Sequence, residues 1–391
     1  MSHHCSGYDA VVVGAGAIGL ACAWRAAERG LAVAVVDPQP RSGASYAAAG
    51  MLAPVTELHH GEERLLRLNL AGAERYPSFV ADLEQVSGQS VAFRGCGTLA
   101  VAVDAGDRAV LDDVGALQRR LGIHADTLTG RECRHLEPLL TPQVHGGLLV
   151  AGDHQVDSRR LTDALLAAVQ RRGGTLVRGC VSEVVVRGGA VSGVRLDDGT
   201  RLDCGSVVLA AGAWSTQVCG IPADVLPPVR PVKGEILRLR VPSSHRPFLS
   251  RTVRGTVRGF EVYLVPREDG ELVVGATQLE QGYDEQVTAG GVYQLLRDAH
   301  ALVPGITELA LVETRAGLRP ASPDNAPIVG RTTLPGLVLA TGHHRNGILL
   351  TPITADVVAA LLADDTPPTA MDPFSPRRFA SVEHAFEGAC A

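Results

Sequence analysis

The stretch 8-YDAVVVGAGAIGLACAWRAAERGLAVAVVD-37 decides the fold of this chain. It opens with an apolar run that ends in glycines, and an alanine-rich segment with helical spacing then continues to Gly30. A second apolar run follows and ends at Asp37. A strand, a helix and a second strand in this order indicate a βαβ unit with a right-handed crossover. We therefore predict a Rossmann-type α/β domain that begins here.

The glycines of this stretch fit the G-x-G-x-x-G pattern at Gly14, Gly16 and Gly19. Glycine permits a tight turn, close approach of the backbone to a pyrophosphate, and close packing of the helix on the strand. The N–H groups at the helix N-terminus favour the pyrophosphate, and Asp37 can accept a hydrogen bond from a ribose hydroxyl. The alternative is a glycine-containing packing turn, but the surrounding strands, helix and acid favour a dinucleotide site.

Composition narrows the class of protein. The chain has 391 residues, which exceeds the usual size of one hydrophobic core, so about two domains are expected. The formal net charge of −6 argues against a nucleic-acid-binding protein. The longest apolar runs are too short to span a bilayer, and the N-terminal residues lack the layout of a signal peptide. We expect a cytoplasmic protein with no integral membrane segment.

No metal site is predicted. The eight cysteines are scattered and none forms a C-x-x-C pair, so neither a zinc site nor a redox dithiol is indicated. Two adjacent histidine pairs, His59–His60 and His343–His344, are not interpreted as a proton relay or a metal site. Reduced and mostly buried thiols are the simplest interpretation.

Two features favour FAD over NAD as the dinucleotide. The strand in 207-VVLAAGAW-214 ends in a turn of small residues, and in flavoproteins of this type a late strand of that kind returns to the nucleotide. The chain has no second G-x-G-x-x-G, so no separate site for NAD(P)H is indicated. By itself the 207–214 segment could equally be an ordinary buried strand.

Hydrophobic periodicity predicts the remaining elements and a discontinuous domain organisation. Helices are predicted at 62–86, 107–121, 158–172 and 289–303, strands at 96–103, 232–241, 260–267 and 271–277, and a loop at 38–50. We expect an FAD-binding domain built from 1–90, 151–226 and 312–370. A mainly antiparallel, α+β substrate domain would comprise 91–150 and 227–311, followed by a loosely held tail at 371–391.

Linked segments along the chain resemble the D-amino-acid-oxidase-type flavoproteins, and most closely the glycine oxidases of thiamine biosynthesis. The resemblance covers about Tyr8 to Leu362. It rests on 14-GAGAIG-19, 45-SYAAAGMLAP-54, 232-VKGE-235, 262-VYLVPR-267, 274-VGAT-277, 316-AGLRPASPDNAPIVGR-331 and 342-GHHRNGILLTP-352. Gln278 and His344 depart from the glycine-oxidase pattern near the expected pocket, so the resemblance does not specify the exact substrate.

The resemblance implies noncovalent FAD, because no cysteine lies in the 316–331 segment where related flavoproteins tether the cofactor. It also implies that the terminal helix, expected to start within 342-GHHRNG-347, points its N-terminus at the flavin's pyrimidine edge. Main-chain N–H groups would stabilise negative charge there. The expected cofactor-binding residues are Gly14, Gly16, Ala17, Ile18, Gly19, Asp37, Pro38, Ala44, Ser45, Ala49, Gly50, Met51, Val184, Gly212, Trp214, His343, His344, Arg345, Asn346, Gly347, Ile348 and Leu349.

The resemblance further implies a carboxylate clamp in which Arg319 and Tyr263 hold the substrate over the flavin, with Arg345 at the far edge of the pocket. An arginine fork matches a carboxylate bidentately. Without the family, a lone arginine is more often a surface ion pair, and a tyrosine on an alternating strand is more often core. With the carboxylate anchored, hydride transfer from a neutral amine needs orientation more than acid–base help, so no general base is predicted.

The sequence therefore predicts an FAD-dependent oxidase that deaminates glycine and small amines such as sarcosine and D-alanine to the imine or oxo acid, ammonia and hydrogen peroxide. Thiamine thiazole synthesis is the implied context, with dioxygen as co-substrate and a homo-oligomer, a tetramer or dimer, as the assembly. The alternatives are a D-amino-acid dehydrogenase with a non-oxygen acceptor and a non-catalytic flavin-fold binding protein.

Overall fold

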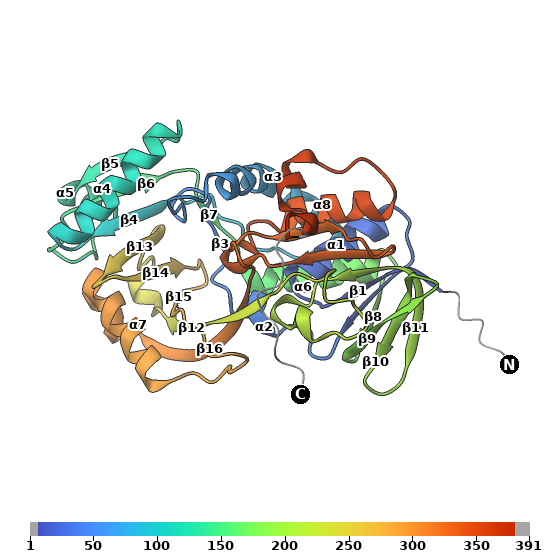
Figure 1. Cartoon of the computed structure of the whole chain (residues 1–391). Coiled ribbons are helices and arrows are strands. Elements are labelled where there is room, and N and C mark those ends of the chain that lie inside the picture. Colours follow the sequence, from blue (N-terminus) through green and yellow to red (C-terminus); the bar gives the residue numbers. More distant parts are fainter. Residues whose placement is uncertain (1–6, 380–391) are drawn as a thin grey trace.

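Two large sheets with helices packed on them make up the molecule (Figure 1). The structure, a computed structural model, describes residues 7–379. The first sheet has the order β17-β18-β11-β1-β2-β8, with β9 and β10 extending from β11. Its strands are β1 (Tyr8–Val13), β2 (Val33–Asp37), β8 (Thr175–Arg178), β9 (Val181–Arg187), β10 (Ala190–Leu196), β11 (Arg201–Leu209), β17 (Ile328–Arg331) and β18 (Leu337–Thr341).

The βαβ unit predicted from the opening stretch is confirmed. β1 pairs in parallel with β2 on one side and with β11 on the other, and β11 pairs in parallel with β18. Residues 181–209 form a meander, because β9, β10 and β11 pair antiparallel. Strand β1 is therefore central, and its carboxyl end carries the glycine motif.

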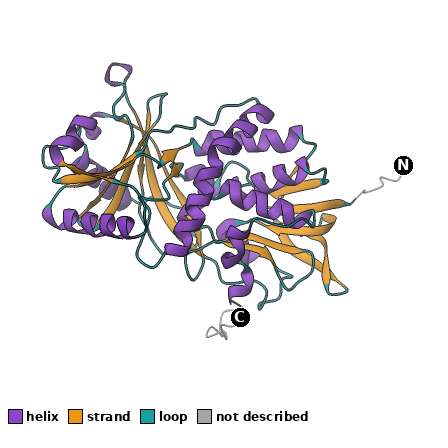
Figure 2. Ribbon diagram, turned by 90° about the horizontal axis from the view of Figure 1, so that it is seen from above, coloured by secondary structure: helices purple, strands orange, loops and turns teal. Residues whose placement is uncertain are grey.

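Four helices cover this sheet and pack on one another (Figure 2). They are α1 (Ala17–Glu28), α3 (Glu63–Ser87), α6 (Ser158–Arg171) and α8 (Thr351–Leu362). The fully buried Trp24 of α1 meets Phe79 of α3 edge-on, with ring centroids 5.3 Å apart. This aromatic contact packs α1 and α3, which are separated in the sequence by residues 29–62, into one hydrophobic core. No helix within 7–379 is long and apolar enough to cross a membrane.

The second sheet is antiparallel except between β4 and β13, and its order is β16-β12-β15-β14-β13-β4-β6-β5. Its strands are β4 (Thr98–Ala102), β5 (Asp126–Thr129), β6 (Gly146–Val150), β12 (Arg230–Arg240), β13 (Thr252–Val257), β14 (Phe260–Pro266), β15 (Glu271–Gly275) and β16 (Ala310–Ala321). The helices beside it are α4 (Ala105–Arg120), α5 (Gly130–Leu136) and α7 (Ala289–Leu302). The predicted α/β fold with a second, mainly antiparallel sheet is confirmed.

The predicted domain boundaries remain a proposal, and strand pairing moves one of them. β16 pairs with β12 from Arg230↔Ala321 to Arg240↔Ala310, so residues 312–321 belong to the second sheet. The prediction assigned them to the first domain. The chain therefore returns to the first sheet only at β17. A small pair of strands, β3 (Met51–Leu52) and β7 (His154–Gln155), lies apart from both large sheets.

Three local expectations were wrong. The predicted loop at 38–50 contains the short helix α2 (Gly43–Ala47). The terminal helix α8 begins at Thr351, and the GHHRNG motif before it forms the 3₁₀ turn η4 (His344–Asn346). The described part of the predicted loose tail forms η5 (Thr369–Phe374) and η6 (Pro376–Phe379), with Met371 and Phe374 buried in the core of the first sheet. The rest of that tail lies outside the described residues.

Lys233, the only lysine in the chain, is completely buried on β12. Its ammonium donates to a carboxylate oxygen of Asp284 at 2.7 Å and to the carbonyl of Gln286 at 2.9 Å. Its backbone also pairs with that of Leu279. Because a buried ammonium is costly unless it is paired and hydrogen-bonded, these contacts fix the 279–286 segment against β12. That segment passes beside the cavity described next.

Candidate active site

A cavity of about 1270 Å³ is lined by residues of both sheets and of the connecting segments. This exceeds the usual 300–1,000 Å³ of a small-molecule site, so it has room for a dinucleotide together with a small substrate. Most predicted site residues line it. They are Gly14, Gly16, Ile18, Asp37, Pro38, Ala44, Ser45, Ala49, Gly50, Met51, Gly212, Trp214, Tyr263, Arg319, His343, His344, Arg345, Gly347 and Ile348.

At the nucleotide end, the backbone is shaped as the glycine motif predicts. Gly14 has φ 106°, and a Cβ there would lie 2.5 Å from the carbonyl oxygen of Ala210. The Asp37 carboxylate accepts from the N–H of Ala15 at 2.7 Å, which holds it at the end of β2 beside the motif. The hydroxyl of Ser45 accepts from the N–H of Ala17 at 3.0 Å and keeps its own proton for donation. These groups suit a ribose and a pyrophosphate.

Five predicted cofactor residues do not line the cavity. Gly19 allows α1 to approach β1, since a Cβ would lie 2.0 Å from the Gly14 carbonyl oxygen. Ala17 contributes its backbone N–H to Ser45 rather than a surface. The other three have buried side chains that lie outside the cavity wall, namely Val184, Asn346 and Leu349.

Val184 is a predicted cofactor-binding residue whose side chain does not line the cavity. It is completely buried in the core beside the first sheet, whereas Val181 and Ser182, earlier on the same strand, line the cavity. The valine-rich run 184-VVV-186 gave no signal about which face meets the nucleotide.

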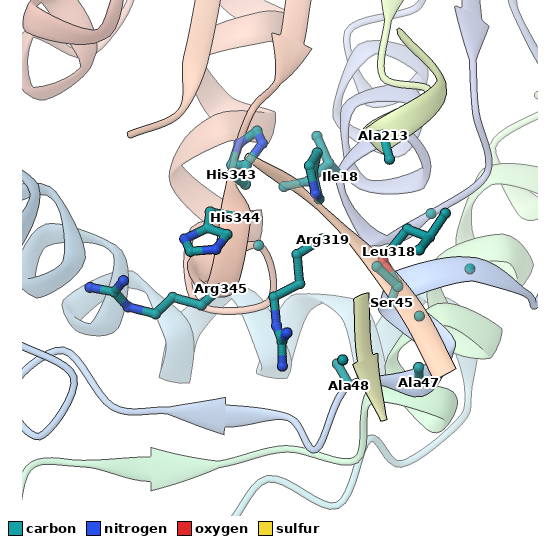
Figure 3. A pocket seen from close by; sticks show the side chains of 18 of the residues that line it. Ile18, Ser45, Ala47, Ala48, Ala213, Leu318, Arg319, His343, His344 and Arg345 are labelled. Atoms are coloured by element: carbon teal, nitrogen blue, oxygen red, sulfur yellow. The ribbon is translucent and has the colours of Figure 1, made fainter. Parts of the chain in front are cut away.

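The C-terminal motif forms one wall of the cavity, with His343, His344 and Arg345 side by side (Figure 3). His343 is buried and its Nε2 lies 3.0 Å from the hydroxyl of Thr354. His344 is 8% exposed, has φ 47°, and neither ring nitrogen has a partner. Burial lowers the pKa of both imidazoles to about 3. Both rings are therefore neutral near pH 7, and this wall is polarised by backbone groups and arginines.

Arg319 differs from every other arginine that lines the cavity. Its Nη1 donates to the carbonyl of Thr277 at 3.2 Å, and within residues 7–379 it has no carboxylate partner. The other cavity arginines each have one, and the pairs are Arg41–Asp163, Arg254–Glu57, Arg315–Glu313 and Arg345–Glu62. The remaining donors of Arg319 are free to bind a carboxylate from a ligand.

Two glycines make room for the predicted clamp. A Cβ on Gly234 would lie 2.4 Å from Nη1 of Arg319, and a Cβ on Gly275 would lie 2.3 Å from the hydroxyl of Tyr263. Burial raises the pKa of Tyr263, although nearby Arg319 opposes the shift, so the phenol keeps its proton. The two side chains thus present a guanidinium and a phenolic O–H at the same end of the cavity.

The sequence interpretation missed several charged residues of this end, namely Glu57, Glu62, Arg254 and Glu261. They occur in segments where charge is ordinary, so no motif distinguished them. Gln278, noted as a departure from the family pattern, does line the cavity. Among residues 7–379, no group of three or more histidine, cysteine or acidic side chains could hold a metal ion.

Comparison with known families decides the identity of this site. Residues 9–361 match the model of the DAO family, described as FAD dependent oxidoreductase. The chain belongs to this family. FAD is therefore its cofactor, and the glycine motif, Asp37 and Ser45 are suitably arranged to hold it.

Relatives within the DAO family carry several names. The chain is 35% identical over 380 residues to a bifunctional protein ThiO/ThiG of Synechocystis sp., covering 95% of this chain and 54% of that protein. The chain thus spans about half the length of that relative. It is 31% identical over 409 residues to the hydrogen cyanide synthase subunit HcnC of Pseudomonas aeruginosa, covering 95% of this chain and 96% of that protein.

A solved structure of the same family supports the fold directly. The crystal structure of glycine oxidase from Geobacillus kaustophilus superimposes with a TM-score of 0.86 at 33% identity, covering 95% of this chain and 98% of that one. The predicted family, the fold class and the class of FAD-dependent oxidoreductase are thereby confirmed.

Proposed function

We propose that this protein oxidises the amine of glycine and of small amino acids such as sarcosine and D-alanine. The observation that carries the proposal is the guanidinium of Arg319, which lines the cavity without a carboxylate partner among the described residues. The glycine oxidase match over nearly the whole chain supports the choice of substrate. Dioxygen is the proposed electron acceptor, with imine or oxo acid, ammonia and hydrogen peroxide as products.

The residues of the chain orient the substrate. Arg319 binds the α-carboxylate through its free donors, and the Tyr263 hydroxyl donates to the same group. When bound, FAD supplies the hydride acceptor for the α-carbon. Because burial lowers the pKa of His343 and His344 to about 3, both rings are weak proton acceptors, and neither is assigned as a general base. Orientation with an anchored carboxylate is the main contribution of the protein.

We propose that FAD lies along the cavity from Asp37 to the C-terminal motif. Gly14, Gly16 and Ser45 would hold the pyrophosphate, and the 43–51 segment would pass close to the flavin. A bound flavin would also meet the unpartnered His344, whose ring nitrogens otherwise lack hydrogen bonds. A homo-oligomer, a cytoplasmic location and a role in thiamine thiazole synthesis remain part of the proposal.

An anaerobic absorbance scan of the purified protein tests the activity. Glycine, sarcosine and D-alanine are added in turn, and air is then admitted. We expect the yellow bands to bleach with glycine and to return in air with peroxide formation. A yellow protein that none of the three amines bleaches would contradict the substrate. Bleaching that air does not reverse would favour a dehydrogenase with another acceptor.

A second candidate is a subunit of a cyanide-forming enzyme, because the match to HcnC covers 96% of that relative. The products of glycine turnover distinguish the amine oxidase from the cyanide-forming enzyme. Glycine turnover with ammonia and no detectable cyanide supports the oxidase, whereas stoichiometric cyanide with little ammonia supports the alternative.

A further inference from the structure

Three carboxylates and two further guanidiniums surround the substrate end of the cavity beside Arg319. They belong to Glu57, Glu62, Glu261, Arg254 and Arg345. Arg345 pairs with Glu62 and also donates to the carbonyl of Glu57, so that pair is neutral. The remaining three residues form a connected group, which we call the Arg254 cluster: Glu57, Arg254 and Glu261.

The Arg254 cluster carries one negative charge in excess. Arg254 has a 9% exposed side chain and donates to Glu57 at 2.8 Å and to Glu261 at 3.3 Å. Glu57 is also largely buried, with 12% exposure, whereas the Glu261 side chain is 57% exposed. The shorter contact and deeper burial assign Glu57 to Arg254. Glu261 is therefore the carboxylate with capacity left for a ligand.

Glu261 stays ionised at neutral pH, since Arg254 first and the nearby His59, Arg345 and Arg319 next hold the pKa of its carboxyl below the usual range. When a substrate carboxylate neutralises Arg319, this wall is left with the negative charge of Glu261. A negative wall attracts a cationic group on the ligand and repels an anionic one.

The position of Glu261 relative to the clamp sets the size of that group. Glu261 and Tyr263 are two residues apart on β14, so both side chains lie on the same face, roughly 7 Å apart along the strand. This spacing is comparable with the reach of an extended five-carbon amino acid from its carboxylate to a terminal amine. A glycine would leave the space between them to water.

We propose that Glu261 is a specificity-determining residue that selects amino acids with a positively charged side-chain amine, of the length of ornithine, over neutral and acidic ones. This inference rests on the proposed function, because it requires the α-carboxylate to sit on Arg319. It deepens that function by naming a substrate class beyond glycine. Acidic amino acids of the same length are the class that the site rejects.

Three isosteric ligands that lack an α-amine test the charge preference without turnover. They are 5-aminopentanoate, hexanoate and glutarate, which place an ammonium, a methyl group or a carboxylate at the same distance from the anchored carboxylate. Dissociation constants are measured by calorimetry on the FAD-loaded enzyme at pH 8. We expect 5-aminopentanoate to bind about fivefold to tenfold more tightly than hexanoate, and glutarate to bind more weakly than both.

The variant Glu261→Gln keeps the size of the side chain and removes its charge. It should reduce the ratio between 5-aminopentanoate and hexanoate to less than twofold. Glu308→Gln is the matched control, since Glu308 is exposed and does not line the cavity, and it should leave the ratio unchanged. Raising the salt concentration from 50 to 500 mM should shrink the wild-type preference, which a purely structural role would not do.

The outcomes separate the two proposals. Equal wild-type affinities, or a ratio that survives Glu261→Gln, overturn the role of Glu261 while glycine bleaching still supports the oxidase. If none of the three carboxylates binds, the Arg319 clamp is wrong and the inference falls with it. If the charge preference holds but no amino acid bleaches the flavin, the charge selection stands and the oxidase activity is wrong.

Discussion

The two ends of the cavity are built in different ways. At the nucleotide end, the site is formed mainly by backbone groups of one continuous stretch, namely the turn at Gly14 and the helix α1 that follows. At the substrate end, charged side chains come from segments far apart in the sequence, such as Glu57, Arg254 and Arg319. A site formed by backbone groups depends on the exact path of the chain and tolerates few substitutions. A site formed by charged side chains can change its charge, and therefore its ligand, by substitution of single residues. The first end therefore contains the motif typical of the family, and the second is the end where we propose that substrate specificity arises.

Gly14→Ala should have the largest effect and tests how far the nucleotide end depends on backbone shape. A Cβ would overlap the Ala210 carbonyl oxygen and would also have to adopt φ 106°. We expect FAD affinity to fall more than about a thousandfold, from steric overlap and backbone strain together. The measurement is fluorescence titration of the apoprotein with FAD.

Gly30→Ala is the control for that experiment. Gly30 also has a positive φ, of 84°, but nothing lies within 4 Å of its added Cβ. It should lose stability by about 1 kcal/mol and bind FAD normally. Equal FAD affinity in Gly14→Ala and wild type would show that the close approach to Ala210 does not matter.

Arg319→Met should have the next largest effect and tests the substrate end. Removing the cavity's unpaired guanidinium should lower kcat/KM for glycine about a thousandfold, or about 4 kcal/mol, because a charge-assisted bidentate contact is lost. The FAD spectrum and content should be unchanged. Arg315→Met is the comparison, since Arg315 lies near Glu313 and Tyr46, and it should cost less than tenfold. Similar losses in both variants would contradict the special role of Arg319.

Acid pH should weaken the wall formed by the C-terminal motif. Burial lowers the pKa of His343 and His344 to about 3, so between pH 6.5 and 3 the folded state binds fewer protons than the unfolded state. The stabilisation is present above pH 6.5 and is lost as pH falls, by up to about 1.4 kcal/mol per unit for each histidine. Urea unfolding at pH 7 and pH 5 measures this slope.

His343→Gln should reduce the number of protons taken up on unfolding by about one, and so should make the dependence of the unfolding free energy on pH less steep. Asp153 acts in the opposite direction, because burial raises its pKa to about 6, so its stabilising contribution grows as pH falls from 6 to 4. Asp153→Asn should therefore make the acid loss steeper. An unchanged slope in His343→Gln would mean that folding does not lower the pKa of this histidine.

Gly234→Ala should have the smallest effect and sharpens the comparison at the substrate end. The added Cβ would displace the end of a flexible arginine side chain rather than backbone, so Arg319 should shift without loss of the fold. We expect KM for glycine to rise about tenfold with little change in FAD binding. Gly290→Ala on α7, where the Cβ meets only ordinary contacts, should leave KM unchanged. A fall in kcat with unchanged KM would contradict this reasoning.

The sequence predicted the nucleotide end well because its signals are local. The period-2 and period-3.6 patterns and the spacing of three glycines are all contained in thirty residues. The helix α2 was missed because small residues of 43–47 pack against Gly317 of β16, which is a contact between distant segments. Val184 was misplaced because three valines follow one another at 184–186, so the sequence did not indicate which residue of the strand lines the cavity.

The substrate end could be predicted only where a family resemblance marked particular residues. Arg319 and Tyr263 were found in this way, and their roles remain proposals. Arg254 was not found, since one arginine among many carries no local signal of the two carboxylates that meet it. Charge networks of this kind depend on which strands become neighbours, and the neighbours of β13 include β4, about 150 residues earlier in the chain.

The buried position of Lys233 has a practical consequence for chemistry on this protein. Apart from the α-amino group of the chain, it is the only primary amine, and it is inaccessible while the 279–286 segment stays in place. Amine-directed reagents should therefore leave Lys233 unmodified while the protein stays folded. The rate of acylation at Lys233, measured by mass spectrometry, would report how often the 279–286 segment separates from β12.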